Sequence, residues 1–131
     1  MKGLCILGAT GSIGVSTLDV VARHASLYNV VALTANNNID LLYEQCLEHH
    51  PEYVVVVDEN KASVFSEKLK NSPISDIKVL SGAQSLEYVA TLDNVDSVMA
   101  AIVGAAGLLP SLAAAKAGKI ILLAKSSFQK I

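Results

Sequence analysis

The sequence is poor in several residue types, and each shortage argues against a class of protein. It has no tryptophan, 5% aromatic residues, two cysteines, three prolines and 17% charged residues, with a net charge of −2. So small a net charge gives no electrostatic basis for binding nucleic acid or an anionic lipid surface. No apolar run approaches the roughly 20 residues that a membrane-spanning helix needs. We therefore expect neither nucleic acid nor a membrane as a partner.

The scarcity of cysteine bears on the cellular compartment. Cys5 and Cys46 lie far apart and lack the spacing of metal ligands. We interpret both as small buried apolar residues, which is typical of a protein kept in a reducing compartment. The first apolar run begins almost at Met1, so we expect no signal peptide and a cytoplasmic location.

The residues that are abundant predict the fold. Hydrophobic residues make up 52% of the chain, and short apolar runs alternate with segments of helical periodicity. We predict strands over residues 4–7, 30–34, 53–57, 77–80, 97–103 and 120–124, and helices over 12–24, 39–50, 61–69, 85–91 and 109–117. The strands are apolar throughout rather than alternating, which indicates burial on both faces and parallel pairing through helical crossovers. The sequence thus predicts an α/β fold: a doubly wound, mostly parallel, Rossmann-like sheet in a single domain, with its ligand at the carboxyl ends of the strands.

The helical spacing also predicts which side chains face the core. The expected buried sets are Ile13, Thr17, Val20, Val21 and His24 in the first helix, Ile39, Tyr43, Cys46, Leu47 and His50 in the second, and Ala62, Phe65 and Leu69 in the third. Ser12 is the expected N-cap of the first helix. Pro51 should end the second helix near His50, and Gly118 should cap the fifth.

A glycine motif follows the first predicted strand. Its candidate cofactor-binding residues are Gly8, Thr10, Gly11, Ser12, Ile13 and Gly14. Between a strand and a helix, the first glycine permits a tight turn, the second lets the backbone approach a pyrophosphate, and the third permits close packing. The phosphates would lie at a helix N-terminus, which attracts anions. The alternative is a tight turn that binds nothing. No G-K-[ST] sequence follows, so the motif is not a Walker P-loop.

Three asparagines follow the second predicted strand. Asn36, Asn37 and Asn38 stand where an NAD-specific site usually has a carboxylate that accepts from the ribose 2′-hydroxyl. Without a carboxylate the site permits a 2′-phosphate, to which the amides can donate hydrogen bonds, although they bring no positive charge. We interpret them as NADP-binding residues. The alternative is a polar turn that caps the helix beginning at Ile39.

The remaining candidate residues give weaker indications of a function. The stretch from Met99 to Gly107 is rich in alanine and glycine and fits either the approach of a ribose or ring to the backbone or close helix–sheet packing. The three histidines lie at or near helix ends. Asp58 ends a strand, where capping is the favoured interpretation. We assign no catalytic residue and no metal ligand to this chain.

Longer stretches of the sequence resemble a known family. Residues 6–14, 16–21, 30–33, 100–110, 118–119 and 122–124 match the NADPH-binding N-terminal domain of 1-deoxy-D-xylulose 5-phosphate reductoisomerases. The resemblance implies that Thr10, Gly11, Ser12 and Ile13 contact the pyrophosphate and its neighbouring ribose, and that the asparagines surround the 2′-phosphate. It further implies a homodimeric enzyme of the non-mevalonate isoprenoid pathway. That enzyme rearranges the sugar phosphate 1-deoxy-D-xylulose 5-phosphate and reduces it with NADPH to 2-C-methyl-D-erythritol 4-phosphate, with Mg or Mn as divalent metal.

The sequence departs from the family pattern in two places. The family often has glycine and then a basic residue where this chain has Asn36 and Asn37. It also continues after the last strand as Ala-Asn-Lys-Glu-Ser, whereas Ala124 is followed here by Lys125 and a different tail. We therefore expect an NADP-binding domain over residues 1–124, a divergent tail over 125–131, no catalytic domain, and no activity from this fragment alone. The alternatives are a stand-alone, non-catalytic NADP-binding module and the cofactor domain of another NADP oxidoreductase, such as a semialdehyde dehydrogenase.

Overall fold

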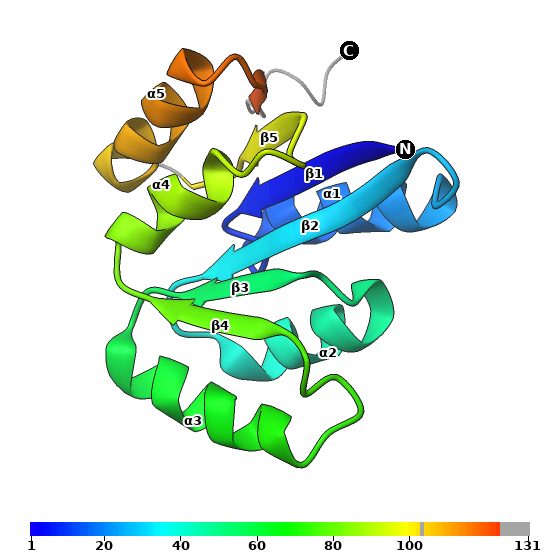
Figure 1. The fold of residues 1–131 in the computed structure, drawn as a ribbon, viewed down its shortest axis with the longest axis vertical. Helices are drawn as coiled ribbons and strands as arrows, with labels where there is room; N and C mark the ends of the chain where they lie inside the picture. The colour runs from blue at the N-terminus through cyan, green and yellow to red at the C-terminus, as the bar shows by residue number, and fades with distance from the viewer. Residues whose placement is uncertain (103, 124–131) are drawn as a thin grey trace.

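A computed structural model describes residues 1–102 and 104–123 of the chain (Figure 1). The strands are β1 (Lys2–Leu7), β2 (Tyr28–Ala35), β3 (Tyr53–Val56), β4 (Lys78–Ser81), β5 (Ser97–Ala100) and β6 (Ile120–Leu123). The helices are α1 (Ser12–Arg23), α2 (Ile39–His49), α3 (Glu59–Lys70), α4 (Gln84–Ala90) and α5 (Leu108–Lys116), with a 3₁₀ turn, η1, over Ala105–Gly107. Each predicted strand and helix is present, with ends that shift by a few residues.

The strands form one parallel sheet in the order β4-β3-β2-β1-β5-β6. From β1 to β4, each new strand is added on the same side of the one before it. The chain then crosses back to place β5 on the other side of β1, so the order reverses between β1 and β5. In open parallel sheets, ligands bind at such a reversal, beside the carboxyl ends of the strands. The prediction of a doubly wound parallel sheet is confirmed.

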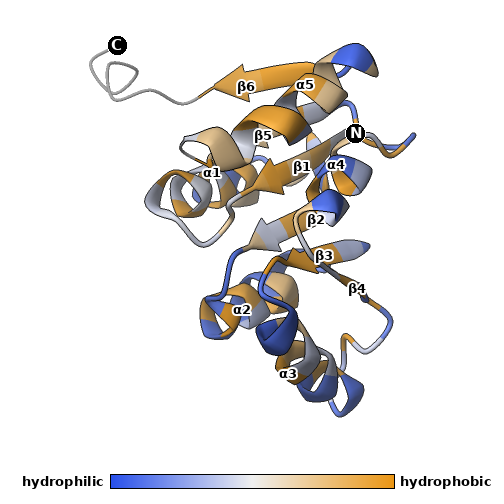
Figure 2. Ribbon diagram, turned by 90° about the vertical axis from the view of Figure 1, so that its left-hand side faces the viewer, coloured by the Kyte–Doolittle hydropathy of each residue, from blue (hydrophilic) through white to orange (hydrophobic). Residues whose placement is uncertain are grey.

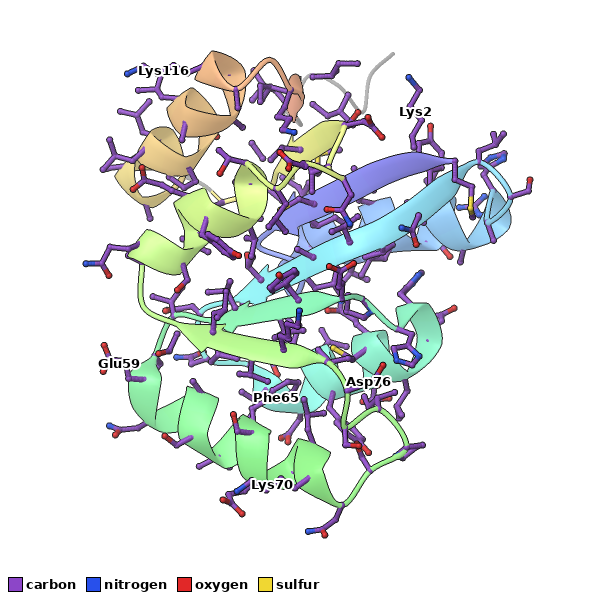
Figure 3. The ribbon with its side chains drawn as sticks, in the orientation of Figure 1. Lys2, Glu59, Phe65, Lys70, Asp76 and Lys116 are labelled. Atoms are coloured by element: carbon purple, nitrogen blue, oxygen red, sulfur yellow. The ribbon has the colours of Figure 1, made fainter. Side chains whose placement is uncertain are left out.

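Helices cover both faces of the sheet. One core cluster joins the sheet to α1, α2 and α3 and includes Leu18, Leu42 and Phe65. The second joins the sheet to α4 and α5 and includes Val89 and Ala114. Hydropathy colouring marks β1, β5 and β6 as apolar strands (Figure 2). Phe65 is fully buried, whereas Glu59 and Lys70 lie at the exposed ends of the same helix (Figure 3).

The predicted core faces are right for α3 and partly wrong for α1 and α2. The third helix buries Ala62, Phe65 and Leu69, as expected. The first buries Gly14, Leu18 and Val21, so the prediction is right at Val21; Ile13 and Thr17 are half-buried, and the prediction is wrong at Val20 and His24, which are exposed. The buried stripe runs through a glycine, which an apolar pattern does not register. The second buries Leu42, Gln45 and Cys46 and leaves Leu47 and His50 exposed, while Ile39 and Tyr43 are partly buried.

The ends of the elements show the expected signals. His50 follows α2 with a φ of 45° and a ψ of 61°, immediately before Pro51. Gly118 has a φ of 82°; its N–H donates to the Ala115 carbonyl, and the Lys119 N–H donates to the Ala114 carbonyl. These two bonds make a Schellman cap after α5. The predicted strand over 97–103 is too long, since β5 ends at Ala100. Val103 and the predicted tail with Lys125 lie outside the described residues.

Candidate dinucleotide-binding site

The turn between β1 and α1 begins the candidate site. Gly8 has a φ of 85° and follows β1 directly. Gly11, with a φ of −76° and a ψ of 170°, is the N-cap of α1 and has no side chain that could accept from the first-turn N–H groups. The expectation that Ser12 is the N-cap is therefore wrong. Ser12 is already the first helical residue, because the glycine before it takes up the extended backbone that a cap requires.

The N-terminus of α1 differs from those of its neighbours α2 and α3. In α2, the Asn38 side chain accepts from the Leu41 N–H, and Asp40 lies in the first turn. In α3, the Asp58 side chain accepts from two backbone N–H groups, as expected for a capping residue, and Glu59 follows. The first turn of α1 has neither a capping side chain nor an acidic residue. Its partial positive charge is therefore left uncompensated by its own cap and first turn.

Backbone amides at this turn are free to donate. Among residues 1–102 and 104–123, the N–H groups of Thr10, Ser12, Ile13 and Gly14 have no backbone acceptor. Gly11 and Ser12 are exposed, and Thr10 and Ile13 are half-buried. The arrangement is a cluster of donors at the positive end of a helix, which suits a phosphate group.

The three glycines of the motif serve different purposes. A Cβ on Gly14 would overlap the Gly8 carbonyl oxygen and lie 2.6 Å from the Ala9 Cα, and a Cβ on Gly8 would lie 3.2 Å from the Ala101 carbonyl oxygen. Gly8 and Gly14 are thus required by the fold. A Cβ on Gly11 would meet only the Gly8 carbonyl oxygen, at 3.7 Å, an ordinary contact. Nothing in residues 1–102 and 104–123 requires glycine at this position, so its missing side chain leaves a space that suits a bound diphosphate.

Two buried polar residues hold the turn from the side of β2 and α2. Thr34 Oγ1 accepts from the Gly8 N–H at 2.9 Å, and the Thr34 carbonyl accepts from the Ala9 N–H at 2.7 Å. Gln45 Nε2 donates to the Ala9 carbonyl at 2.8 Å. Sequence reasoning missed both roles. For Gln45 a signal existed, since a polar residue stands between Leu42 and Cys46 on the buried face of the helix.

The asparagines lie at the same edge of the sheet as the glycine turn. Asn36, Asn37 and Asn38 follow β2, which pairs with β1, and all three are exposed. The cap formed by Asn38 confirms the capping alternative for that residue. The Asn36 carbonyl accepts from the Asp58 N–H at 3.0 Å, which ties this segment to the end of β3. The side chains of Asn36 and Asn37 have no hydrogen-bond partner within the described residues, so their amides remain available to a ligand.

The chain beyond β5 borders the turn on its other side. The Ala101 N–H donates to the Leu7 carbonyl at 3.0 Å, which brings the alanine–glycine stretch beside Gly8. A Cβ on Gly107 would lie 2.8 Å from the Ile102 carbonyl oxygen, so close packing explains this glycine. Gly104 is exposed, with no heavy atom of the described chain within 4 Å of a Cβ placed on it.

Burial perturbs the titration of two cysteines and one histidine. Burial raises the pKa of the Cys5 and Cys46 thiols to about 12, which keeps them protonated and confirms them as buried apolar residues. Burial lowers the pKa of His49, partly opposed by the Glu48 carboxylate. The described residues contain no group of three or more His, Cys, Asp or Glu side chains that could hold a metal ion.

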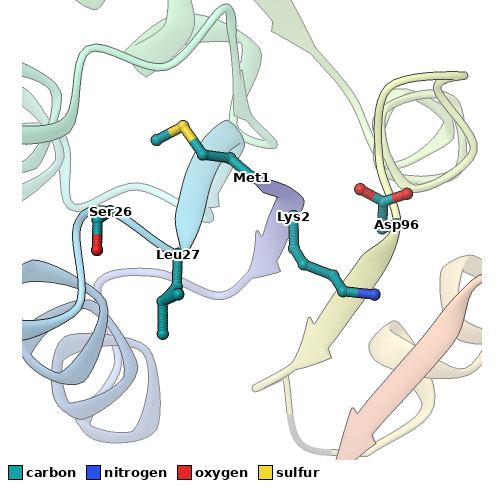
Figure 4. Close-up of a pocket in the computed structure, with 5 residues that line it drawn as sticks. All are labelled: Met1, Lys2, Ser26, Leu27 and Asp96. Atoms are coloured by element: carbon teal, nitrogen blue, oxygen red, sulfur yellow. The ribbon is translucent and has the colours of Figure 1, made fainter.

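A shallow pocket lies at the opposite edge of the sheet. It has a volume of about 430 Å³ and is lined by Met1, Lys2, Ser26, Leu27 and Asp96 (Figure 4). These residues adjoin the amino ends of β1, β2 and β5, away from the carboxyl ends. This pocket therefore plays no part in the candidate site. None of the helices in the described part of the chain has the length and apolarity needed to cross a membrane.

The parallel sheet, its reversal between β1 and β5, and the glycine turn define a Rossmann-like domain of the dinucleotide-binding class. A family model described as 1-deoxy-D-xylulose 5-phosphate reductoisomerase matches residues 4–127, and the chain belongs to this family. That match sets aside the alternative of another NADP oxidoreductase.

Individual relatives carry the same name. The 1-deoxy-D-xylulose 5-phosphate reductoisomerase of Methylococcus capsulatus is 60% identical over 124 residues, which are 95% of this chain and 32% of that protein. The Nitrosomonas europaea enzyme is 57% identical over 123 residues, 94% of this chain and 30% of that protein. The chain thus spans about a third of the length of these relatives.

Solved structures agree with the sequence comparison. A crystal structure of DOX-P reductoisomerase in complex with NADPH, fosmidomycin and magnesium has a TM-score of 0.90 and 44% identity, over 95% of this chain and 30% of that one. The reductoisomerase from Zymomonas mobilis in complex with NADPH has a TM-score of 0.86 and 38% identity, over 95% of this chain and 32% of that one.

Proposed function

We propose that this chain binds NADPH and is the cofactor-binding part of an enzyme that converts 1-deoxy-D-xylulose 5-phosphate to 2-C-methyl-D-erythritol 4-phosphate in isoprenoid synthesis. The observation that carries the proposal is the first turn of α1, where free amides meet the space above Gly11. The family membership and the NADPH complexes of its structural neighbours support it.

NADPH supplies a hydride to the substrate when it is bound. The part of this chain is to bind and orient the cofactor. The free backbone N–H groups of Thr10, Ser12 and Ile13 donate to the diphosphate, which lies against Gly11, while Gly8 and Gly14 fix the shape of the turn. The proposed binding unit covers residues 1–124.

The asparagines provide the proposed contact with the 2′-phosphate. Within the described part of the chain, Asn36 and Asn37 have side-chain amides without a partner, and Asn38 keeps its NH₂ group after using its oxygen as a cap. Amides donate hydrogen bonds to a phosphate but bring no charge. Asn37→Lys adds a cation where the family often has a basic residue. At an exposed site this should strengthen NADPH binding roughly two- to fivefold and leave NADH binding unchanged.

We assign the remaining chemistry to the part of the relatives that this chain does not span. The divalent metal, the sugar-phosphate substrate and the dimer contacts fall in that part. Large exposed apolar side chains on α5 and β6 support this division, because they suit a surface covered by further protein: Leu108, Leu109, Leu112, Ile120 and Leu123. The complete enzyme is proposed to be a cytoplasmic homodimer.

Titration of the ¹⁵N-labelled chain tests the proposal. NADPH should shift the amide signals of Thr10, Gly11, Ser12 and Ile13. The signals of Lys2, Ser26 and Asp96, at the opposite edge of the sheet, serve as the internal control and should stay in place. Tighter binding of NADH than NADPH, or shifts only at the opposite edge, would contradict the proposal.

The remaining alternative is a stand-alone NADP-binding module. Mixing the chain with the complementary two-thirds of a relative separates the two. Cofactor-dependent turnover of 1-deoxy-D-xylulose 5-phosphate supports the enzyme, whereas NADPH binding without association supports the module.

A further inference from the structure

Gln45 is a buried polar residue that connects α2 to the glycine turn. It is 7% exposed, and its Nε2 reaches the Ala9 carbonyl, 36 positions away in the sequence, at 2.8 Å. A carbonyl oxygen only accepts hydrogen bonds, so the amide nitrogen must face Ala9. The orientation of the Gln45 side chain is thereby fixed.

The hydrogen bonding of Gln45 is incomplete. With Nε2 turned toward Ala9, the buried Oε1 has no hydrogen-bond partner among the described residues. A buried acceptor without a partner costs free energy, and an apolar side chain of similar length would fill the same space without that cost. An apolar side chain would, however, leave the buried Ala9 carbonyl without this donor, so the filling of the core does not account for glutamine at this position. The hydrogen bond from Gln45 to the turn is what accounts for glutamine here.

The bonded carbonyl belongs to the peptide group that carries the Thr10 N–H. A peptide group is planar, so holding its oxygen also fixes the direction of its N–H. Thr34 holds the preceding N–H groups of Gly8 and Ala9. The Ala9 carbonyl therefore lies between the part of the turn that β2 holds and the free N–H groups of Thr10 and the first turn of α1.

Gln45 also connects the two parts of the candidate site, which are the glycine turn and the asparagine segment. It lies on α2, the helix that begins directly after Asn38, and its neighbours Leu42 and Cys46 anchor that helix in the core. One rigid helix thus carries the asparagine segment at its N-terminus and holds the glycine turn from its middle.

We propose that Gln45 is a positioning residue for the cofactor's diphosphate: it holds the Ala9–Thr10 peptide so that the Thr10 N–H and the first-turn amides of α1 point toward the same phosphate group. This inference rests on the proposed function. It assigns to Gln45 no contact with the cofactor.

Three variants test this role. Gln45→Met has a similar length and no donor. Gln45→Glu has nearly the same shape but places a carboxylate oxygen against the Ala9 carbonyl. Cys46→Ala is the matched control, because it removes buried volume from the next position of α2 and leaves Gln45 and its hydrogen bond to Ala9 in place. Each variant is measured for NADPH affinity, for thermal unfolding and for the Thr10 amide signal without ligand.

The expected results separate positioning from stability. Gln45→Met should shift the Thr10 amide signal in the free chain and weaken NADPH binding roughly three- to tenfold, the factor associated with one hydrogen bond. Gln45→Glu should bind weakly at pH 8 and recover affinity as the pH falls, because the protonated carboxyl group regains a donor. Cys46→Ala should lower the unfolding temperature and leave both the affinity and the Thr10 signal unchanged.

Contrary results are equally distinct. Wild-type affinity and an unshifted Thr10 signal in Gln45→Met would refute the inference alone. An equal loss of affinity in Cys46→Ala would show that packing of α2 is sufficient, which also overturns it. Failure of the wild-type chain to bind NADPH would refute the proposed function and, with it, the role of Gln45 in binding.

Discussion

Replacing Gly11 with aspartate should separate the stability of the domain from its affinity for the cofactor. The backbone at Gly11 is extended, with a φ of −76° and a ψ of 170°, and a Cβ there meets no close neighbour. The natural cap of α3 shows what the new side chain would do. Asp58 Oδ1 accepts from the Asn60 N–H at 3.0 Å and from the Lys61 N–H at 3.2 Å. Gly11→Asp should copy this arrangement onto α1.

The expected gain in stability is the sum of three small contributions. Aspartate is a better N-cap than glycine by a few tenths of a kcal/mol. A carboxylate at a helix N-terminus adds about 0.3–1 kcal/mol. Loss of glycine's freedom in the unfolded chain adds about 0.4–1 kcal/mol. A total of about 1–2 kcal/mol would raise the unfolding temperature by roughly 3–10 °C in a domain of this size.

The same substitution should weaken NADPH binding by at least about tenfold. The carboxylate would occupy the space above the turn, use first-turn N–H groups and repel the diphosphate, so that at least one charge-assisted hydrogen bond is lost. Gly11→Ala is the control. It adds a Cβ without a cap or a charge. Its gain from the reduced freedom of the unfolded chain is offset because alanine is a poorer N-cap than glycine, so its unfolding temperature should stay near the wild-type value, and its affinity should fall less. Calorimetry and NADPH titration measure the two quantities. Wild-type affinity in Gly11→Asp would refute the placement of the diphosphate.

Three further predictions concern the stability of the fold. Gly14→Ala should destabilise the domain by about 1–3 kcal/mol in chemical denaturation, because its Cβ would overlap the backbone of Gly8 and Ala9; a neutral effect would show that α1 does not pack as closely as described. Lowering the pH from 7 to 5 should reduce stability, because burial lowers the pKa of His49 below its usual 6.5 in the folded state, so the unfolded chain protonates first. His49→Gln should make the stability curve flatter over this interval, and an unchanged slope would contradict the assignment. At lower pH a second loss is expected, since the hydrogen bond from His50 lowers the pKa of Asp76 below its usual 3.8 and the unfolded chain takes up that proton first.

The sequence predicted the elements well because both faces of this sheet are buried. Continuous apolar runs such as Tyr53–Val56 stand out clearly between amphipathic helices. The strand order was not predictable from such local signals. It depends on which distant strands pair, and the placement of β5 beside β1 creates the binding edge.

The errors of prediction arise where glycine or a buried polar residue takes the place of an apolar one. The core face of α1 was misassigned because Gly14 is part of the buried stripe, and the cap was misassigned because Gly11 occupies it. Gln45 was overlooked because its burial makes sense only once the Ala9 carbonyl is seen beside it. The glycine turn itself was recognisable, since its spacing between a strand and a helix is a local signal.

A crystal structure of the chain with NADPH tests the central claim most directly. The account predicts diphosphate oxygens within hydrogen-bond distance of the Ser12 and Ile13 N–H groups, directly above Gly11. A diphosphate bound elsewhere on the chain, or a first turn of α1 closed by the protein's own side chains, would contradict it.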